Sequence, residues 1–223
     1  IGINERGRTE NCVADGELAA TLDNAGGIAG WNYYGTIEGC QSHGNISSDG
    51  DNAGGITGRN FYSSISNCHS EGFIEGEEMV GGIAGYNDQS TIDNCSSHSK
   101  ATGNRYAGGV AGYNKGTIET SFSTGRANAS GTIGDYAGGF VGYNEGTISL
   151  SFTNAKAKGS DDGTGGFVGE NAGSIDNCFS RGDAIGTGSG SDHIGGFSGL
   201  NDGTITDCYS TGVASGNDNV GGF

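Results

Sequence analysis

The sequence predicts an all-β protein: a parallel β-solenoid of about eight coils, with three short strands per coil and a right-handed winding. A seven-residue phrase, Gly-Gly-(Ile/Val/Phe)-x-Gly-x-Asn, recurs along the whole chain, for example at 81–87 and 138–144. Its spacing of 26 to 30 residues is typical of solenoids, in which each repeat buries its apolar side chains only against its neighbours. Frequent glycines disfavour helices, and parallel crossovers are right-handed by default.

Composition narrows the classes of partner and the number of domains. The 223 residues include 48 Gly and no Pro, and the net charge is −16 with only ten Lys and Arg. Nucleic acids and anionic membrane surfaces attract basic patches, so neither is expected as a partner. No apolar run approaches 18 residues, so no membrane insertion is expected. Because the repeat continues throughout, residues 1–223 are expected to form one domain.

Alternation within one repeat predicts which side chains face inward. In the first strand of the repeat at 108–131, Val110 is expected to point inward and Ala111 outward. In the second strand Ile118 points inward. A bend at Thr120, usually Asn or Asp in other repeats, changes the phase, and a third strand lies near residues 126–129. The variable Ser, Asp, Asn and Gly segment that follows is expected to hold the insertions.

Stacking in register converts each repeat position into a ladder along the axis. Two inward ladders form the predicted core. The first contains Ile28, Ile56, Ile83, Val110, Phe140, Phe167, Phe197 and Phe223, and the second contains Ile37, Ile65, Ile92, Ile118, Ile148, Ile175 and Ile205.

Asparagine occupies the last position of the phrase in every repeat. The ladder comprises Asn4, Asn32, Asn60, Asn87, Asn114, Asn144, Asn171 and Asn201. Asn tolerates turn conformations, and stacked Asn amides can bond to the amides above and below. We therefore assign this ladder a structural role.

Six cysteines share one repeat position, with Ser121 and Ser151 on the remaining two rungs. They are Cys12, Cys40, Cys68, Cys95, Cys178 and Cys208, and their spacing fits no zinc motif. Two interpretations stand: a buried stack of small thiols, or disulfides Cys12–Cys40, Cys68–Cys95 and Cys178–Cys208 between rungs ~4.8 Å apart.

Outward aromatic residues form two partial stripes. One contains Trp31, Tyr86, Tyr113 and Tyr143, and the other contains Phe122, Phe152, Phe179 and Tyr209. Such side chains can contact glycans or a neighbouring fibre, or they can simply cover their neighbours in the sheet. Both interpretations stay open.

Acidic residues collect in the variable turns, and no cofactor is expected. They include Asp49, Asp51, Glu75, Glu77, Glu78, Asp161, Asp162 and Asp218. Solvated loop charges are the favoured interpretation, with Ca²⁺ ligation as the alternative. The nonapeptide pattern of calcium-binding β-rolls is missing.

The repeat resembles the GLUG motif. The residues that carry the resemblance are the phrase at 81–87 and Gly-Thr-Ile-x-x-Cys-x-Ser-x-Gly at 203–212. GLUG repeats are found in exported bacterial and archaeal surface proteins, including adhesin-like proteins and the non-catalytic region of IgA-cleaving metalloproteases. The resemblance implies an extracellular or cell-surface β-solenoid and brings no active site. The metalloprotease motif His-Glu-x-x-His is missing at His43, His69, His98 and His193.

The eighth copy of the phrase is divided between the two ends of the sequence. Its residues are Gly221, Gly222 and Phe223, followed by Ile1, Gly2, Ile3 and Asn4. We expect either head-to-tail stacking of copies or a segment of a longer tandem array, and both give an open-ended contact. The leading hypothesis is therefore a structural filament or adhesin shaft, and not an enzyme. The alternatives are a glycan-binding adhesin module and a polysaccharide-degrading β-helix, for which no coil carries an unusual charged cluster on its strands.

Overall fold

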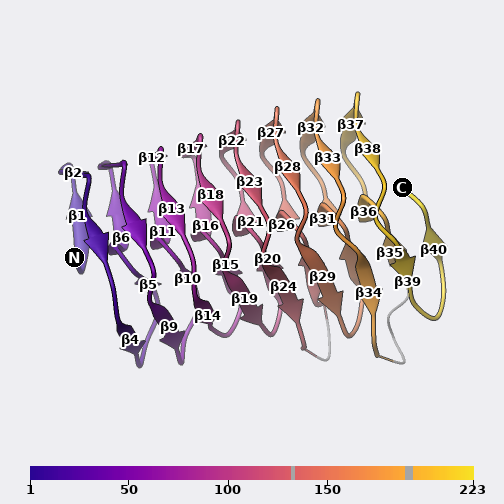
Figure 1. The fold of residues 1–223 in the computed structure, drawn as a ribbon, viewed down its shortest axis with the longest axis horizontal. Helices are drawn as coiled ribbons and strands as arrows, with labels where there is room; N and C mark the ends of the chain where they lie inside the picture. The colour runs from indigo at the N-terminus through magenta and orange to yellow at the C-terminus, as the bar shows by residue number, and fades with distance from the viewer. Residues whose placement is uncertain (132–133, 189–192) are drawn as a thin grey trace.

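The chain winds into a rod of stacked coils. The computed structural model describes residues 1–131, 134–188 and 193–223, and these contain 40 strands and no helix long and apolar enough to cross a membrane. Successive coils lie side by side along the long axis, with the N-terminus at one end and the C-terminus at the other (Figure 1). The predicted all-β parallel solenoid is confirmed: five eight-stranded sheets run along the rod, and each coil contributes one strand to each sheet.

The first sheet carries the phrase and contains the longest strands. It consists of β1 (Ile3–Glu5), β6 (Ala29–Tyr33), β11 (Thr57–Phe61), β16 (Ala84–Asp88), β21 (Ala111–Asn114), β26 (Val141–Asn144), β31 (Val168–Asn171) and β36 (Ser198–Asn201). The register places Asn above Asn throughout, as in the pairs Asn32 with Asn60 and Asn87 with Asn114.

The second sheet carries the isoleucine ladder. It consists of β2 (Arg8–Glu10), β7 (Thr36–Glu38), β12 (Ser64–Ser66), β17 (Thr91–Asp93), β22 (Thr117–Glu119), β27 (Thr147–Ser149), β32 (Ser174–Asp176) and β37 (Thr204–Thr206). The central Ile of each strand is fully buried from β7 to β32, while Thr9 takes this place in β2.

The third sheet is built from two-residue strands. It consists of β3 (Val13–Ala14), β8 (Gln41–Ser42), β13 (His69–Ser70), β18 (Ser96–Ser97), β23 (Phe122–Ser123), β28 (Phe152–Thr153), β33 (Phe179–Ser180) and β38 (Tyr209–Ser210). The first residue of each strand faces outward and the second faces inward, from β13 to β33 most clearly.

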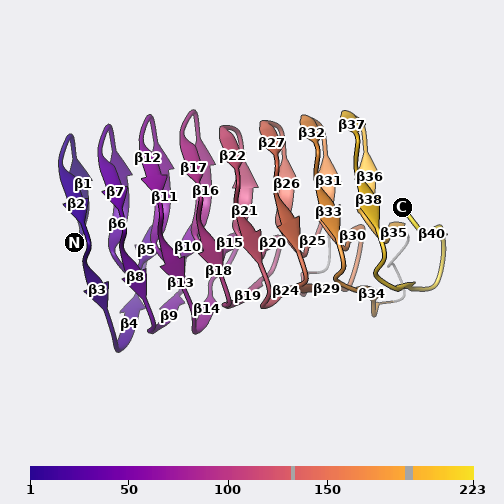
Figure 2. The same ribbon diagram turned by 45° about the horizontal axis from the view of Figure 1, so that its top comes forward.

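The fourth and fifth sheets close the coil. The fourth consists of β4 (Glu17–Ala20), β9 (Asn45–Ser48), β14 (Phe73–Glu75), β19 (Lys100–Gly103), β24 (Arg126–Ala129), β29 (Lys156–Gly159), β34 (Ala184–Gly186) and β39 (Ala214–Ser215). The fifth consists of β5 (Ala25–Gly26), β10 (Ala53–Gly54), β15 (Met79–Gly81), β20 (Tyr106–Gly108), β25 (Tyr136–Gly138), β30 (Gly163–Gly165), β35 (His193–Gly195) and β40 (Val220–Gly221). Figure 2 shows the same stack turned by 45°.

Each coil has five strands, and not the three predicted from the sequence. The extra strands are the two-residue strands of the third sheet and the strands of the fifth sheet just before each phrase, such as β23 and β20. A single left-handed residue before the third-sheet strands, and the glycines of the phrase after the fifth-sheet strands, interrupt the alternation of inward and outward side chains in the sequence. The predicted bend is a single left-handed residue: Thr120 has a φ of 48° and Leu150 a φ of 50°, in the place that Asn94 and Asn177 fill in other coils.

The core has two parts along the rod. The larger part lies inside the first three sheets and contains both predicted aliphatic ladders together with most of the cysteines. Ala111 also belongs to it and is fully buried, so its predicted outward orientation is wrong. The smaller part lies between the fourth and fifth sheets and consists of residues such as Ile46, Val80 and Ala127, which the sequence pattern did not reveal.

A narrow waist separates the two parts of the core, at the second glycine of each phrase. A Cβ atom on Gly82 would lie 2.0 Å from the Ser97 hydroxyl and 2.1 Å from the next coil's backbone oxygen at Gly109. Where the walls meet, serines of the third sheet donate hydrogen bonds to phrase carbonyls, as in Ser123 Oγ to Gly139 O at 2.7 Å. Glycine is required here because opposite walls touch.

Candidate functional site: ladders and end faces

The asparagine ladder is a continuous chain of side-chain hydrogen bonds. Asn4 Nδ2 donates to Asn32 Oδ1 at 2.8 Å, and the same bond repeats coil by coil through Asn171 Nδ2 to Asn201 Oδ1, at 2.8 to 2.9 Å. The six Asn side chains between the end coils are fully buried. Seven bonds therefore connect all eight coils through the interior, which fits a structural role.

All seven amide bonds point in the same direction. Every Nδ2 donates toward the C-terminal end of the rod, and every Oδ1 accepts from the coil before it. The ladder therefore ends with an Nδ2 at Asn201, which reaches only Gly203 O at 3.4 Å, and begins with an Oδ1 at Asn4. One end of the rod offers a donor and the other an acceptor.

The six cysteines are free thiols, stacked on one another in the two blocks of coils that carry them. The inter-rung disulfides that the spacing allowed are not formed in the structure. Instead, the backbone N–H groups of Cys12 and Cys40 each point at the sulfur of the next rung, at 3.4 Å. Burial raises the pKa of the Cys40 thiol to about 11 and that of Cys95 well above its ordinary value. Cys12 is exposed because its rung lies in the end coil.

Thiol titration should separate these cysteines by their position in the stack. We expect Ellman's reagent to react quickly with Cys12 in the native protein and slowly with Cys40, Cys95 and Cys178, because a buried thiol of raised pKa holds little thiolate. Unfolding in denaturant without reductant should release six thiols, the full cysteine content. A count that rises only after reduction would instead establish disulfides.

The phenylalanine stripe is a self-stacked ladder. Phe122, Phe152, Phe179 and Tyr209 follow one another on the third sheet with ring centroids 4.9 to 5.1 Å apart and planes within 2 to 5° of parallel. Each inner ring therefore has both faces covered by its neighbours. Sugar rings pack on aromatic faces, so this geometry favours the covering role for the stripe.

The tyrosine stripe is arranged differently and is larger than predicted. Tyr113 and Tyr143 of the first sheet meet Tyr106 and Tyr136 of the fifth sheet, with several rings tilted or edge-on. Carboxylates border the cluster: Tyr113 donates its hydroxyl hydrogen bond to Glu145. Burial and that bond raise the pKa of Tyr113, and burial raises that of Tyr86 to about 12. These phenols stay protonated donors at neutral pH.

Trp31 belongs to a separate aromatic group over coils 2 and 3. It lies beside Tyr33, whose ring stacks on Phe61, and the Arg59 guanidinium lies 5.5 Å from the Trp31 ring and 5.0 Å from that of Phe61. The sequence pattern did not reveal this group because Tyr33 and Phe61 follow the phrase at the ends of β6 and β11, where the first four coils have one residue more than the later ones. Counting turn lengths would have revealed it.

Carboxyls of raised pKa lie in two of the variable turns and on strand β31. The Asp135 side chain is fully buried and accepts hydrogen bonds from Ser160 and from the Asp161 N–H, and burial raises its pKa. Burial and the nearby charge of Glu78 raise that of Asp51, and burial raises that of Glu170. In the described part of the chain, no three His, Cys, Asp or Glu side chains gather in a way that could hold a metal ion.

These carboxyls should make the fold less stable as pH rises from acid to neutral. Above the ordinary values of 3.8 for Asp and 4.5 for Glu, the unfolded chain releases protons that the native state still binds, so stability falls until pH passes the raised native values. We expect a higher Tm at pH 5 than at pH 7 by calorimetry. The variant Asp51→Asn with Glu170→Gln should reduce that difference. A Tm that rises steadily toward pH 7 would contradict the prediction.

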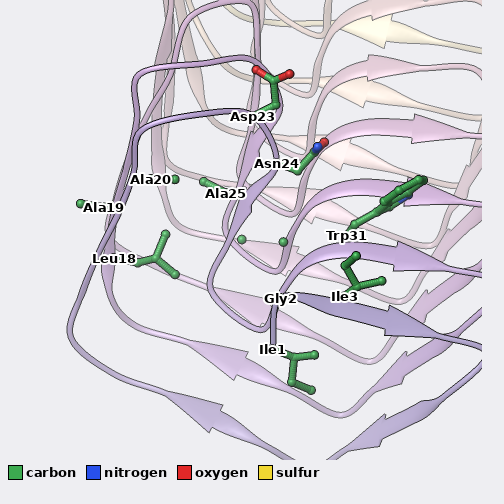
Figure 3. Close-up of a pocket in the computed structure, with 12 residues that line it drawn as sticks. Ile1, Gly2, Ile3, Leu18, Ala19, Ala20, Asp23, Asn24, Ala25 and Trp31 are labelled. Carbon is green, nitrogen blue, oxygen red and sulfur yellow. The ribbon is translucent and has the colours of Figure 1, made fainter.

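Both end faces of the rod expose apolar side chains and unpaired strand edges. At the N-terminal end Ile1 and Ile3 are 64% and 58% exposed, beside a hollow of about 570 Å³ that β1, β4, β5 and β6 surround (Figure 3). At the C-terminal end Phe223 stacks on Phe197 at 4.9 Å and leaves its other face open, at 50% exposure. Phe223 extends the inward ladder by stacking on Phe197. At the other end, the carbonyl oxygens of Ile1 and Gly2 accept hydrogen bonds from the Gly30 and Trp31 N–H groups of the second coil.

The residues predicted at the junction therefore lie at opposite ends of the rod. A methyl group added to Gly2, Gly221 or Gly222 would meet nothing within 4 Å, whereas the equivalent glycines of inner coils are tightly packed. The broken phrase in the sequence points to both sets of residues. It gives no sign of the hollow, which depends on Leu18 and Ala20 of the fourth sheet.

The fold and the ladders define a class of protein: a repeat-based structural β-solenoid. Three consecutive repeats, at residues 23–47, 49–74 and 76–102, match the family model of the GLUG motif. The chain therefore carries GLUG repeats, and the resemblance seen in the sequence is confirmed for these coils. No curated protein and no solved structure matches the chain.

Proposed function

We propose that this solenoid is an extracellular structural subunit, a shaft of a filament or adhesin that extends by stacking coil on coil, head to tail. The observation that carries the proposal is the complementarity of the two end faces. The C-terminal face offers the Asn201 Nδ2 donor and the open ring of Phe223, and the N-terminal face offers the Asn4 Oδ1 acceptor and exposed Ile1. Like faces do not match in this way, because two donors or two acceptors would meet.

Unpaired strand edges support the same conclusion. Each of the five sheets ends in one strand of the first coil and one of the last, so a parallel edge is open at both ends of the described stack. Such edges pair readily with another strand. A heterologous contact that does not close gives an open filament. The coil that covers an end face can belong to a second copy or to further repeats of the same polypeptide.

A pair of one-sided variants tests this contact. Ile1→Asp places a charge on the N-terminal face, and Phe223→Asp places one on the C-terminal face. At physiological salt, which screens the net charge of −16, the wild-type chain should form rods by electron microscopy and should sediment faster with concentration. Each variant alone should form no rods, and the two mixed should form dimers through their intact faces.

The control variant Leu150→Arg changes an equally exposed residue in the middle of the rod and should leave assembly intact. Dimers of either end variant alone would show a contact between like faces, and monodisperse wild-type particles at all concentrations would overturn the filament. The GLUG repeats support the extracellular location, because repeats of this type are found in exported surface proteins. Protease added to intact producing cells should remove the protein, and full protection would count against this location.

The tyrosine cluster favours a second function, adhesion to glycans. Tilted and edge-on contacts join its rings on coils 4 to 6, unlike the parallel stack of the phenylalanine stripe, and Glu145 and Glu170 add hydrogen-bond acceptors for sugar hydroxyls. A glycan array should show hits that Tyr113→Ala with Tyr143→Ala removes and that Phe152→Ala keeps. An array without hits would leave the structural role alone.

A further inference from the structure

Basic side chains gather on one sheet of this acidic rod. Of only ten Lys and Arg in the chain, four lie on the fourth sheet in three consecutive coils: Lys100, Arg126, Lys156 and Lys158. The strand register places Lys100 beside Arg126 and Arg126 beside Lys156, and it places Lys158 beside Asn128 in the next column. We call these four residues the basic ladder.

The basic ladder is largely without carboxylate partners. Lys156 pairs with Asp183 at 2.7 Å, and this contact lowers the pKa of Asp183. In the described part of the chain no ion pair holds Lys100, Arg126 or Lys158. Like charges directly opposite each other on neighbouring strands destabilise a sheet. The chain has 26 Asp and Glu that could have stood beside these cations. Folding alone therefore gives no reason to align the basic side chains with one another.

The surface around the ladder suits a polymer with many hydroxyl groups. A shallow groove of about 260 Å³ is lined by Arg126, Asn128, Lys156 and Lys158, with Ile185 at its end. The neutral polar column Thr102 and Asn128 runs next to the charges. At the other end of the ladder, Phe73 is 60% exposed, and Lys100 Nζ lies 5.8 Å from its ring centroid.

We propose that the basic ladder binds a linear anionic glycan, one carrying carboxylate or sulfate groups, that lies along the axis of the rod. Charges that repeat every coil, at ~4.8 Å, match a regularly charged chain better than a compact anion. Amide and hydroxyl side chains beside the charges can bond to sugar hydroxyls, and Phe73 offers an apolar face to a sugar ring. The inference does not depend on head-to-tail assembly.

Nucleic acid is the less favoured polyanion. Single strands are bound through a succession of aromatic platforms in a basic groove, and the ladder has one exposed aromatic residue on a protein of charge −16. A short patch gives little affinity for a polymer of such charge density when the surrounding surface repels it.

Binding to defined polymers tests the proposal. Isothermal titration should show that the wild-type chain binds polygalacturonate or heparin, more weakly as salt rises, and does not bind dextran. The variant Lys100→Gln with Arg126→Gln and Lys158→Gln should bind at least tenfold more weakly. The control Arg6→Gln with Arg8→Gln and Lys115→Gln removes the same charge from residues outside the fourth sheet and should retain binding within about twofold, as expected of distant surface charges.

The Tm of each variant, measured with and without glycan, distinguishes a loss of binding from a loss of folding. Without ligand, Arg126→Gln should melt at the same temperature as wild type or higher, because it removes repulsion between rungs, and only wild type should gain stability from the glycan. Equal weakening by both triple variants, no binding of either anionic glycan, or tighter binding of single-stranded DNA would each overturn the proposal. So would loss of self-association by the ladder variant without any glycan binding, because the ladder would then dock a second copy.

Discussion

Replacing Asn114 with Asp should destabilise the rod more than any exposed substitution. Asn114 is fully buried, accepts a hydrogen bond from Asn87 and donates one to Asn144, both at 2.8 Å. Aspartate keeps the acceptor and loses the donor, so a carboxylate would face the Asn144 Oδ1 in the interior. Leaving a buried charge without its partner costs about 3–5 kcal/mol. The free energy of unfolding in urea measures the effect.

The variants Asn114→Ala and Asn201→Asp define the comparison. Alanine leaves two buried polar atoms without partners, and each costs about 1–3 kcal/mol. The loss in free energy of unfolding should therefore be similar to that of the aspartate variant or smaller. Asn201 lies exposed at the end of the ladder, where solvent reaches the new carboxylate, so Asn201→Asp should change the free energy of unfolding by less than about 1 kcal/mol. Equal effects at Asn114 and Asn201 would contradict a continuous buried ladder.

Replacing Gly109 with Ala should have the second large effect. Gly109 is the second glycine of its phrase and stands at the waist. A methyl group there would lie 2.1 Å from the backbone oxygen of Gly139 in the next coil and 2.7 Å from Ser123 Cβ. Backbone cannot move away as a flexible side chain can, so we expect a loss of about 3 kcal/mol or more. Calorimetry should show a lower Tm.

The matched control is Gly2→Ala, because a methyl group on Gly2 would meet nothing within 4 Å. We expect its Tm to stay within about 2 °C of wild type, in line with the small effects of surface substitutions. Further replacement of Ser123 by Gly should not rescue Gly109→Ala, since the closest contact is backbone. Rescue by that change would place the conflict at the side chain instead.

Position in the repeat made most of this structure predictable from the sequence. A residue such as Ile118 or Asn114 recurs at the same place in each copy, and stacking in register leaves few choices for its neighbours. The waist could not be predicted, because it brings Gly82 against Ser97 across the interior, and no periodicity within one strand reports on the opposite wall. The second part of the core was missed because alanines such as Ala127 and Ala137 are weakly apolar.

Side-chain roles were harder to predict than side-chain places. The phenylalanine stripe was located correctly, but only ring geometry shows that its faces are covered. The cysteine spacing allowed disulfides, whereas the thiol sulfurs instead accept from backbone N–H groups. The basic ladder escaped notice because its successive coils lie 26 and 30 residues apart, at Lys100, Arg126 and Lys156, in a sequence dominated by acidic charge, and adjacency on the fourth sheet appears only in the fold.

The separation of the two termini along the rod has a mechanical consequence (Figure 1). Tension applied between them acts along the direction in which the coils hold one another, so it pulls each coil away from the next. Stretching would therefore release the rod one coil at a time. A released coil of about 27 residues adds roughly 90 Å of extended chain. A pulled shaft of this design would lengthen in steps and absorb work at each one, while the remaining coils stay folded.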